Sequence, residues 1–539
     1  MKRVATVLLL ILAIGCTRLS QSRSSMPERT QHHELRIGGI GDVTTLNPLL
    51  SSDLIVSWMA QLTMAYLVRY DRANRPIPEL ATTVPSQSNG GISADGKTIT
   101  YHLRRGVRWS DGLRLDADDV VFSTRLIMDP KTNIVSREGW DRITAIDEPD
   151  KYTVVYHLRE PYGPYAATFF STGGSNPAIM PKHLLLATSS INRDAYNALP
   201  VGAGPFKYVR WQRGDRIELV ANARYWRGRP RLERVVYRII PNRDTLLAAL
   251  QTGDVDLWPA AATAYYPRAT RIPGLHVVRQ ASYTYGHLDF NLTHANVAER
   301  TVRKALELAD DRRTQRDKIG HGSGILQDAY VSPKAPDYDR SLGFTAYEPG
   351  KANALLDAAG WIRKSDGIRA KHGVRLAIEL VSNTGSPDTD QRIELLRAGW
   401  RQIGVALVRK NVSPALLFAP YADGGLIFTG RFDVVFFAWY PSASLSPAEM
   451  YSCRAMPPMG QNDMHWCDRK AQQAIDKFLT SYDPAQQRRC SFIVQRRLVE
   501  DVPTIVSAIF EDLFFENRAL SGFKPNQVSF FDDMMAVDI

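Results

Sequence analysis

Short strand-like and helix-like segments alternate along the chain from residue 35 onward, and this alternation restricts the fold class more than any other feature. The segment 151–160, KYTVVYHLRE, alternates apolar and polar residues as a half-buried strand does. Apolar residues recur at helical spacing in 242–256, 301–310 and 349–360. The first of these helices is expected to end at Gly253. The pattern predicts mixed α/β domains.

A strand, a tight turn and a helix start are predicted between residues 97 and 121. The strand segment KTITYHLRRGVRWSDG leads to Asp116, which is suited to cap a helix. Asp118 and Asp119 then fall in the first helical turn, where the helix dipole favours negative charge.

The first fifteen residues have the pattern of a secretory signal peptide. Lys2 and Arg3 precede an uncharged apolar run that ends at Gly15 and is too short to span a bilayer. Ala13-Ile14-Gly15-Cys16 resembles the lipobox of bacterial lipoproteins, although the usual leucine lies one residue early, at Leu12. We predict a signal peptide at 1–15 and lipidation of Cys16. An ordinary signal peptide with an incidental cysteine is the alternative, and both predict export.

The rest of the chain has the composition of an exported globular protein. Residues 16–34 are polar and aperiodic, which predicts a flexible tether behind the lipid anchor. Of the 539 residues, 44% are hydrophobic and 23% are charged, and no later stretch has eighteen consecutive apolar residues. We therefore expect two or three soluble domains.

The positive charge of the chain is spread along its length. Removing Lys2 and Arg3 with the signal peptide leaves 65 basic against 56 acidic residues, a net charge of about +9. Arginines and acidic residues alternate, and no basic arm or zinc-finger spacing occurs. We expect no nucleic-acid partner.

Three cysteines remain after Cys16. Cys453 and Cys467 are separated by thirteen residues rich in turn formers, and export permits a disulfide between them. Cys490 lies in a helical pattern and is expected to be a buried free thiol. A zinc site that uses His465 and Cys467 is the competing interpretation, but it lacks a paired C-x-x-C.

Motifs of catalysis and of cofactor binding are mostly absent. GGIG at 38–41 lacks the full dinucleotide fingerprint, and the serines in GGSNP and GHGSG do not fit the nucleophile elbow. No H-E-x-x-H motif occurs. The sequence therefore predicts no catalytic residues, no metal and no cofactor.

Five blocks in order resemble the family 5 extracellular solute-binding proteins, the oligopeptide, dipeptide and nickel receptors of ABC importers. They cover nearly all of the chain after the tether and lie at 46–50 with 95–123, 201–240 with 249–257, 288–312, 347–376 and 439–467.

The resemblance implies a two-lobed α/β fold of the periplasmic-binding-protein type, class II, with an extra inserted domain. Lobe I is expected to be discontinuous, at 35–75, 198–282 and 505–539. The inserted domain is expected at 76–197 and lobe II at 283–504. The resemblance also implies a function. The protein would be a receptor that captures a small peptide-like or other amphipathic solute and delivers it to an ABC permease and its ATPase.

The same resemblance places the ligand site at the end of the apolar strand FDVVFFAWY. Trp439, Tyr440 and Ser442 are the first candidates, and Tyr283 and Tyr285, just before LDFN, are the others. Aromatic residues at strand ends present flat faces to a ligand but are equally common in cores.

One departure affects the expected ligand. Peptide receptors of the family commonly have an acidic residue soon after this tryptophan, whereas here Trp439 is followed by Tyr-Pro-Ser-Ala-Ser. A buried amino cation needs a partner, which puts a free-peptide ligand in doubt. No histidine cluster supports nickel.

Two other functions are compatible with an exported protein of this kind. An exported hydrolase would need a reactive serine, for which Ser175 and Ser323 are the candidates. A signalling or adhesion module would keep the fold without a transporter.

Overall fold

The computed structural model describes residues 31–539 except 135, 174–176 and 420. The predicted signal peptide, Cys16 and most of the predicted tether therefore lie outside the described residues. Strand β1 begins at Glu34, one residue before the predicted start of lobe I. His33 Nδ1 lies 2.8 Å from an Asp538 carboxylate oxygen, so the two ends of the described chain meet.

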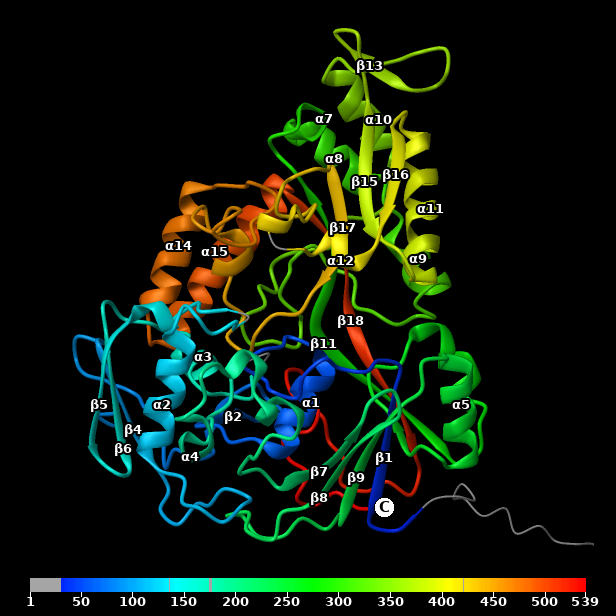
Figure 1. The fold of residues 1–539 in the computed structure, drawn as a ribbon. Helices are drawn as coiled ribbons and strands as arrows, with labels where there is room; N and C mark the ends of the chain where they lie inside the picture. The colour runs from blue at the N-terminus through cyan, green and yellow to red at the C-terminus, as the bar shows by residue number, and fades with distance from the viewer. Residues whose placement is uncertain (1–30, 135, 174–176, 420) are drawn as a thin grey trace, which may run out of the picture.

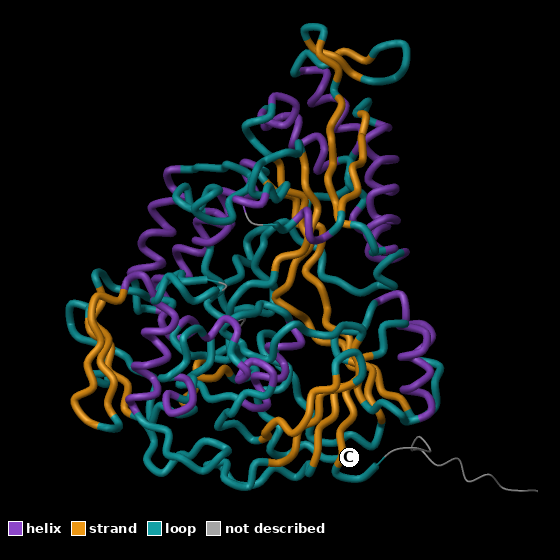
Figure 2. The backbone as a smooth tube through the Cα atoms, viewed as in Figure 1, coloured by secondary structure: helices purple, strands orange, loops and turns teal. Residues whose placement is uncertain are grey.

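A ten-stranded sheet runs through the whole molecule (Figures 1 and 2). The strands, in order across the sheet, are β16 (Ala406–Val412), β15 (Ala377–Asn383), β17 (Val434–Trp439), β11 (Leu275–Phe290), β18 (Thr504–Asn517), β10 (Leu257–Trp258), β1 (Glu34–Gly39), β9 (Arg234–Ile239), β8 (Arg216–Ala221) and β7 (Phe206–Gln212). In one half, β15 pairs in parallel with both of its neighbours, β16 and β17. Helix α11 (Pro387–Gln402) connects β15 to β16, as expected for an α/β unit.

The two longest strands, β11 and β18, connect the two lobes. They pair antiparallel from Leu275↔Asn517 to Asp289↔Thr504, with register shifts between Ala281 and Tyr285 and at Gly286. Figure 1 shows both strands crossing from one lobe to the other. Two paired strands with irregular register are suited to act as a hinge. The residue boundaries that we predicted for the lobes and the inserted domain remain predictions.

Three smaller sheets lie outside the large one. Those that matter for the site belong to the segment between β1 and β7, where β4, β5 and β6 form an antiparallel sheet beside helix α2. The strands of the smaller sheets are β2 (Val68–Tyr70), β3 (Pro76–Pro78), β4 (Thr98–His102), β5 (Ile143–Asp150), β6 (Thr153–Leu158), β12 (Ile362–Arg363), β13 (Arg369–Lys371) and β14 (Val374–Arg375).

The helices pack against the sheets and fill the space around the region between the lobes. They are α1 (Leu54–Thr63), α2 (Ala117–Met128), α3 (Tyr165–Thr168), α4 (Lys182–Leu185), α5 (Arg243–Thr252), α6 (Tyr266–Ala269), α7 (Ala295–Ala298), α8 (Arg300–Leu308), α9 (Arg312–Lys318), α10 (Pro349–Ala358), α11 (Pro387–Gln402), α12 (Pro414–Leu417), α13 (Ala448–Tyr451), α14 (Arg469–Thr480) and α15 (Pro484–Asp501).

Local signals in the sequence placed several of these elements. Asp116 is the N-cap of α2, and its backbone N–H donates to the Asp119 carboxylate at 3.2 Å. Helix α5 ends at Gly253, whose φ of 77° is the left-handed conformation that glycine adopts without strain. Both predictions are confirmed, because each depends on residues within one turn of the helix end.

Helix α1 is held by a close approach of the backbone at Gly202. A Cβ at this position would lie 1.9 Å from the Thr63 carbonyl oxygen, which no side chain tolerates. The neighbouring Gly204 N–H donates to the same oxygen at 2.9 Å. The C-terminus of α1 is therefore fixed, and with it the face of α1 that lines the cavity described below.

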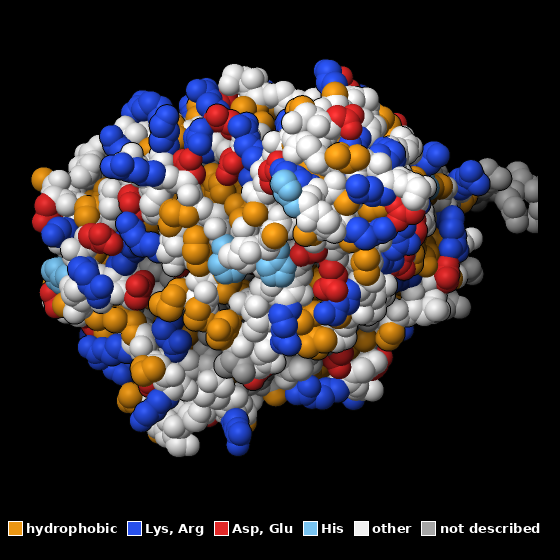
Figure 3. Space-filling view, turned by 90° about the horizontal axis from the view of Figure 1, so that it is seen from above, with side chains coloured by type: hydrophobic (Ala, Val, Ile, Leu, Met, Phe, Trp, Pro, Cys, Tyr) orange, Lys and Arg blue, Asp and Glu red, His pale blue; other side chains and the backbone are white. Residues whose placement is uncertain are grey.

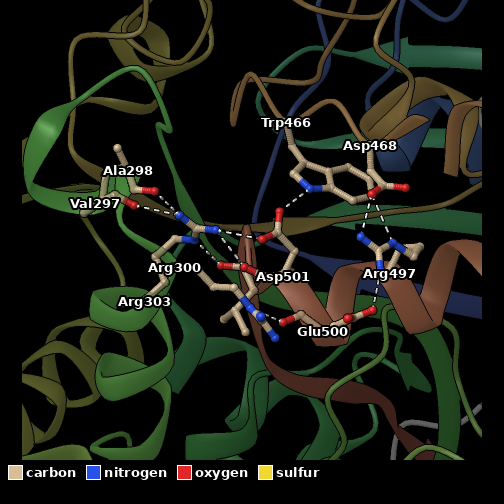
Figure 4. Close-up of polar contacts among 10 residues, drawn as sticks. Val297, Ala298, Arg300, Arg303, Trp466, Asp468, Arg497, Glu500 and Asp501 are labelled. Carbon is tan, nitrogen blue, oxygen red and sulfur yellow. Dashed lines mark hydrogen bonds and ion pairs between the residues drawn. The ribbon is translucent and has the colours of Figure 1, made fainter. Parts of the chain in front are cut away.

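Cys453 and Cys467 form a disulfide in the structure, and Cys490 is a buried free thiol in α15. The loop that the disulfide closes is anchored by polar contacts (Figure 4). Trp466 Nε1 donates to Asp501 at 2.7 Å, and the buried Arg303 donates to the same residue and to two carbonyl oxygens of α7. Because Cys467 is in a disulfide, the alternative zinc site has no thiolate available.

We expect peptide mapping without reductant to find Cys453 joined to Cys467 and Cys490 unmodified. Closing a loop of this length stabilises the folded protein by about 3 kcal/mol, so the double variant Cys453→Ser/Cys467→Ser should unfold at lower urea concentration. Cys490→Ser is the matched control, since it leaves the loop closed. Recovery of Cys490 in a disulfide-linked peptide would contradict this assignment.

The basic residues do not gather in one region of the face seen in Figure 3. Lys and Arg are spread over this face with Asp and Glu among them. The positive net charge is thus distributed there, as the alternation along the sequence indicates.

Candidate functional site

A cavity of about 520 Å³ lies where both lobes and the segment between β1 and β7 meet. Its walls come from four stretches of the chain: 48–61 with α1, described residues of 134–177, 439–461 after β17, and 528–530 near the C-terminus. A site assembled from such distant stretches changes shape when the lobes move relative to one another.

Three of the predicted ligand residues line this cavity. Trp439 is half-buried at the end of β17, and Tyr440 follows it with 47% of its surface exposed. Ser442 lies in the same wall, and its hydroxyl is 2.8 Å from that of Ser444. The apolar strand therefore presents its aromatic end to an open space, as a ligand site requires.

Tyr283 and Tyr285 are not brought to the cavity. They are 3% and 1% exposed and belong to the hydrophobic core, where the Tyr285 and Tyr451 hydroxyl oxygens are 2.9 Å apart. Tyr285 is the register partner of Trp439, so the two residues share a face of the sheet. Its structural role is to support the strand that carries Trp439.

Two carboxylates that sequence reasoning missed lie in the same cavity. Glu138 precedes the 3₁₀ turn Trp140–Arg142, and Glu449 lies in α13. Burial and the charge of Glu138 raise the pKa of Glu449 to about 8. Burial also raises the pKa of Glu138, against the opposing effect of Arg142. No motif in the sequence connects these residues, and only the fold brings them together.

The disulfide-closed loop contributes to the same wall. Gln461 lies in this loop and lines the cavity, and its Nε2 donates to Glu449 at 3.2 Å. The disulfide thus helps to position a residue of the site.

Hydrogen bonds close to one wall of the cavity join the segment before β7 to the second lobe. Gly163 N–H donates to the Leu479 carbonyl at 2.6 Å, and the Tyr482 hydroxyl donates to the Gly96 carbonyl at 2.7 Å. Tyr482 also accepts from the backbone N–H of Tyr162, a residue that lines the cavity. These bonds hold the wall in its present position.

A second cavity of about 410 Å³ adjoins the first, and Leu54 and Tyr440 line both. It contains Arg392 of α11, whose Nη1 donates to Gln315 at 2.8 Å. Gln315 in turn donates to the buried Asp310 carboxylate. The lining also includes Arg316, Asp388 and Asp512, so the second cavity has both cationic and anionic groups, unlike the first.

The described residues offer no further support for catalysis or metal binding. Among them, no group of three or more His, Cys, Asp or Glu side chains is placed to hold a metal ion. Ser175 lies outside the described residues. Ser323 donates to Glu511, which is itself paired with Arg279 at 2.8 Å. Such a carboxylate is engaged by a cation and is poorly suited to activate a serine.

Comparison with known proteins places the chain in a family. Residues 75–459 match the family described as bacterial extracellular solute-binding proteins, family 5 middle. The oligopeptide-binding protein AppA of Bacillus subtilis is 28% identical over 423 residues, 75% of this chain and 76% of that protein. The probable ABC transporter periplasmic-binding protein SapA of Escherichia coli is 26% identical over 540 residues, 94% of this chain and 92% of that protein.

The solved structures show the same fold. The crystal structure of NikA from Brucella suis in complex with Fe(III)-EDTA matches with a TM-score of 0.80 and 22% identity, over 94% of this chain and 99% of that one. The predicted two-lobed fold of the periplasmic-binding type is thereby confirmed. The family match, which covers most of the chain, and the cavity between the lobes lead to the same conclusion: this chain belongs to the bacterial extracellular solute-binding proteins of family 5.

Proposed function

We propose that this protein captures a peptide-like or other amphipathic solute in the cavity between its lobes and delivers it to an ABC permease driven by an ATPase. The observation that carries the proposal is the position of Trp439 and Tyr440, which end a strand of the second lobe inside a cavity whose opposite wall is α1. The proposed role is binding without catalysis.

The edge of β17 offers a further means to bind such a solute. Within the described residues, β15 pairs with β17 only as far as Phe436, whereas β17 continues to Trp439. An extended main chain can pair with an exposed strand edge of this kind, and side chains at alternate positions then enter pockets. The name of the relative AppA, an oligopeptide-binding protein, agrees with a peptide-like ligand, and that of SapA, a probable ABC transporter periplasmic-binding protein, agrees with delivery to a transporter.

Delivery requires that the solute favour one arrangement of the lobes. A ligand shifts such an equilibrium only by its difference in affinity for the two states. A solute that touches Trp439 on one lobe and α1 on the other meets this condition, because those contacts exist together only when the lobes are close. The strands β11 and β18 supply the hinge.

The function is tested by isolating the native protein and identifying what it carries. Mass spectrometry of the denatured sample should release a small amphipathic solute. That solute, added back at a hundredfold excess over its dissociation constant, should stabilise the folded protein by about 2.7 kcal/mol and change its tryptophan fluorescence. If no solute co-purifies and no peptide-like solute stabilises the protein, the proposed function fails.

We also propose that the protein is exported and held at a membrane by a lipid on Cys16. Among the described residues, no helix combines the length and the apolar composition needed to span a bilayer. The proposal rests on the lipobox-like residues that precede Cys16. Because the substitution removes the thiol that would carry the lipid, Cys16→Ser should move the protein from the membrane fraction to the exported fraction that washes off. Cys490→Ser, which alters a buried thiol, should leave the distribution unchanged. Membrane retention of the Cys16→Ser variant would rule out the anchor.

A further inference from the structure

We infer that the solute carries an organic cation, an ammonium or guanidinium group, and that this cation binds between Glu138 and Glu449 in the first cavity. The inference rests on the proposed function and specifies its ligand. It depends on the composition of the cavity walls, on the positions of the two carboxylates and on the groups that surround them.

The walls of the first cavity are aromatic. Aromatic rings attract cations through the negative electrostatic potential of their faces, and the attraction increases when the cation is withdrawn from water. The aromatic residues of the lining are Trp58, Trp140, Tyr162, Trp439, Tyr440 and Phe530. They come from both lobes and from the segment between β1 and β7.

The charged groups of the lining have one sign. Glu138 and Glu449 are its acidic residues, and none of the described lining residues is Lys, Arg or His. Arg137, the neighbour of Glu138 in the chain, donates to the backbone carbonyls of Ile127, Asp129 and Thr132. Arg142 is paired with Glu160. Within the described lining of the cavity, the two carboxylates therefore have no Lys, Arg or His side chain beside them.

The two carboxylates are placed by different elements. Glu449 is fixed by α13 and by the hydrogen bond from Gln461. Glu138 lines the same cavity from the segment that Tyr162 and Tyr482 join to the second lobe. A cation between them would bind both parts of the chain at once. It would therefore favour the closed arrangement of the lobes.

The ionisation of Glu449 predicts that the affinity for a cation depends on pH, and this dependence can be measured. The charge that acts on Glu449 is that of Glu138, which in turn is affected by Arg142 and Asp141. Tyr162 and Tyr285 are close by, and burial raises the pKa of both, so they stay neutral. With its pKa near 8, Glu449 is protonated at pH 6 in the empty cavity. A cation favours the ionised carboxylate, so binding should release a proton. The affinity for a cation should rise with pH by up to about tenfold per unit toward pH 8 and then level off.

The probes are four tripeptides, Ala-Arg-Ala and Ala-citrulline-Ala, each with a free and with an acetylated N-terminus. Citrulline is the neutral counterpart of arginine, so only the acetylated citrulline peptide lacks a cation. Binding is measured by calorimetry and tryptophan fluorescence. On the wild-type protein we expect this peptide to bind at least about 30-fold more weakly than the best of the other three.

Two variants test whether Glu449 causes the discrimination between the cationic and neutral peptides. Glu449→Gln should remove most of this discrimination and the pH dependence measured with the acetylated arginine peptide, whose guanidinium stays charged throughout. Glu394→Gln, an exposed glutamate of α11 paired with Arg397, should change neither. Circular dichroism verifies that both variants are folded.

The outcomes separate the inference from the function. If all four peptides bind equally, or if the co-purifying solute has no cationic group, the inference is wrong and the receptor function stands. A cationic co-purifying solute supports the inference even if these peptides are not bound. If nothing co-purifies and no peptide binds, the function fails and the inference fails with it.

Discussion

Trp439→Ala should lower the affinity for the solute by about 30-fold or more while leaving the protein folded. The indole lies at the end of β17, half-buried and facing the first cavity, where a ligand would remove the rest of its surface from water. Buried aromatic contacts of this kind account for about 2 kcal/mol or more of binding free energy when truncated. Calorimetry with the co-purifying solute measures the change.

Two variants control this experiment. Trp211→Ala removes a half-buried tryptophan of β7 that stacks on Arg213 and lines neither cavity, so it should lose fluorescence but retain affinity. Trp439→Phe keeps an aromatic face and should show an intermediate loss. Wild-type affinity in a folded Trp439→Ala sample would move the site away from β17.

Of the substitutions proposed for this protein, Asp256→Ala should lower the free energy of unfolding most. Asp256 is fully buried, and its carboxylate accepts two hydrogen bonds from the Arg36 guanidinium, at 2.8 and 2.9 Å. It accepts a third hydrogen bond from the backbone N–H of Arg36 at 3.0 Å. Removing the carboxylate leaves the Arg36 cation buried without its partner, which costs about 3 to 5 kcal/mol. The pair joins β1 to the residue before β10, so hydrogen exchange should accelerate most in these two strands.

The control for this prediction is an ion pair of the same type in water. Glu233 pairs with Arg229 at 3.5 Å, and both side chains are more than half exposed. Glu233→Ala should cost at most about 1 kcal/mol, because water already solvates both charges. Equal effects of the two substitutions would show that the buried pair contributes no more than a surface pair.

Several features of this protein were determined by the sequence alone. The start of α2 at Asp116 and the end of α5 at Gly253 depend on hydrogen bonds within one helical turn, which are written in neighbouring residues. Two further features depend on neighbouring residues in the same way. They are the position of Trp439 at the end of an apolar strand and the spacing of the two disulfide cysteines. The order of the five sequence blocks led to the family, because that order reflects the whole fold.

The tertiary structure alone decided which residues form the site. Along β11, every residue from Ser282 to Phe290 is buried, so both faces of this part of the strand lie in the core. Tyr283 and Tyr285, which the family resemblance indicated as ligand residues, are therefore buried and do not line the first cavity. Glu138 and Glu449 lie in different segments and share no motif, and both line the first cavity because the fold brings their segments together. Contacts between distant segments leave no periodic or local pattern in the sequence, and for this reason the acidic part of the site became visible only in the fold.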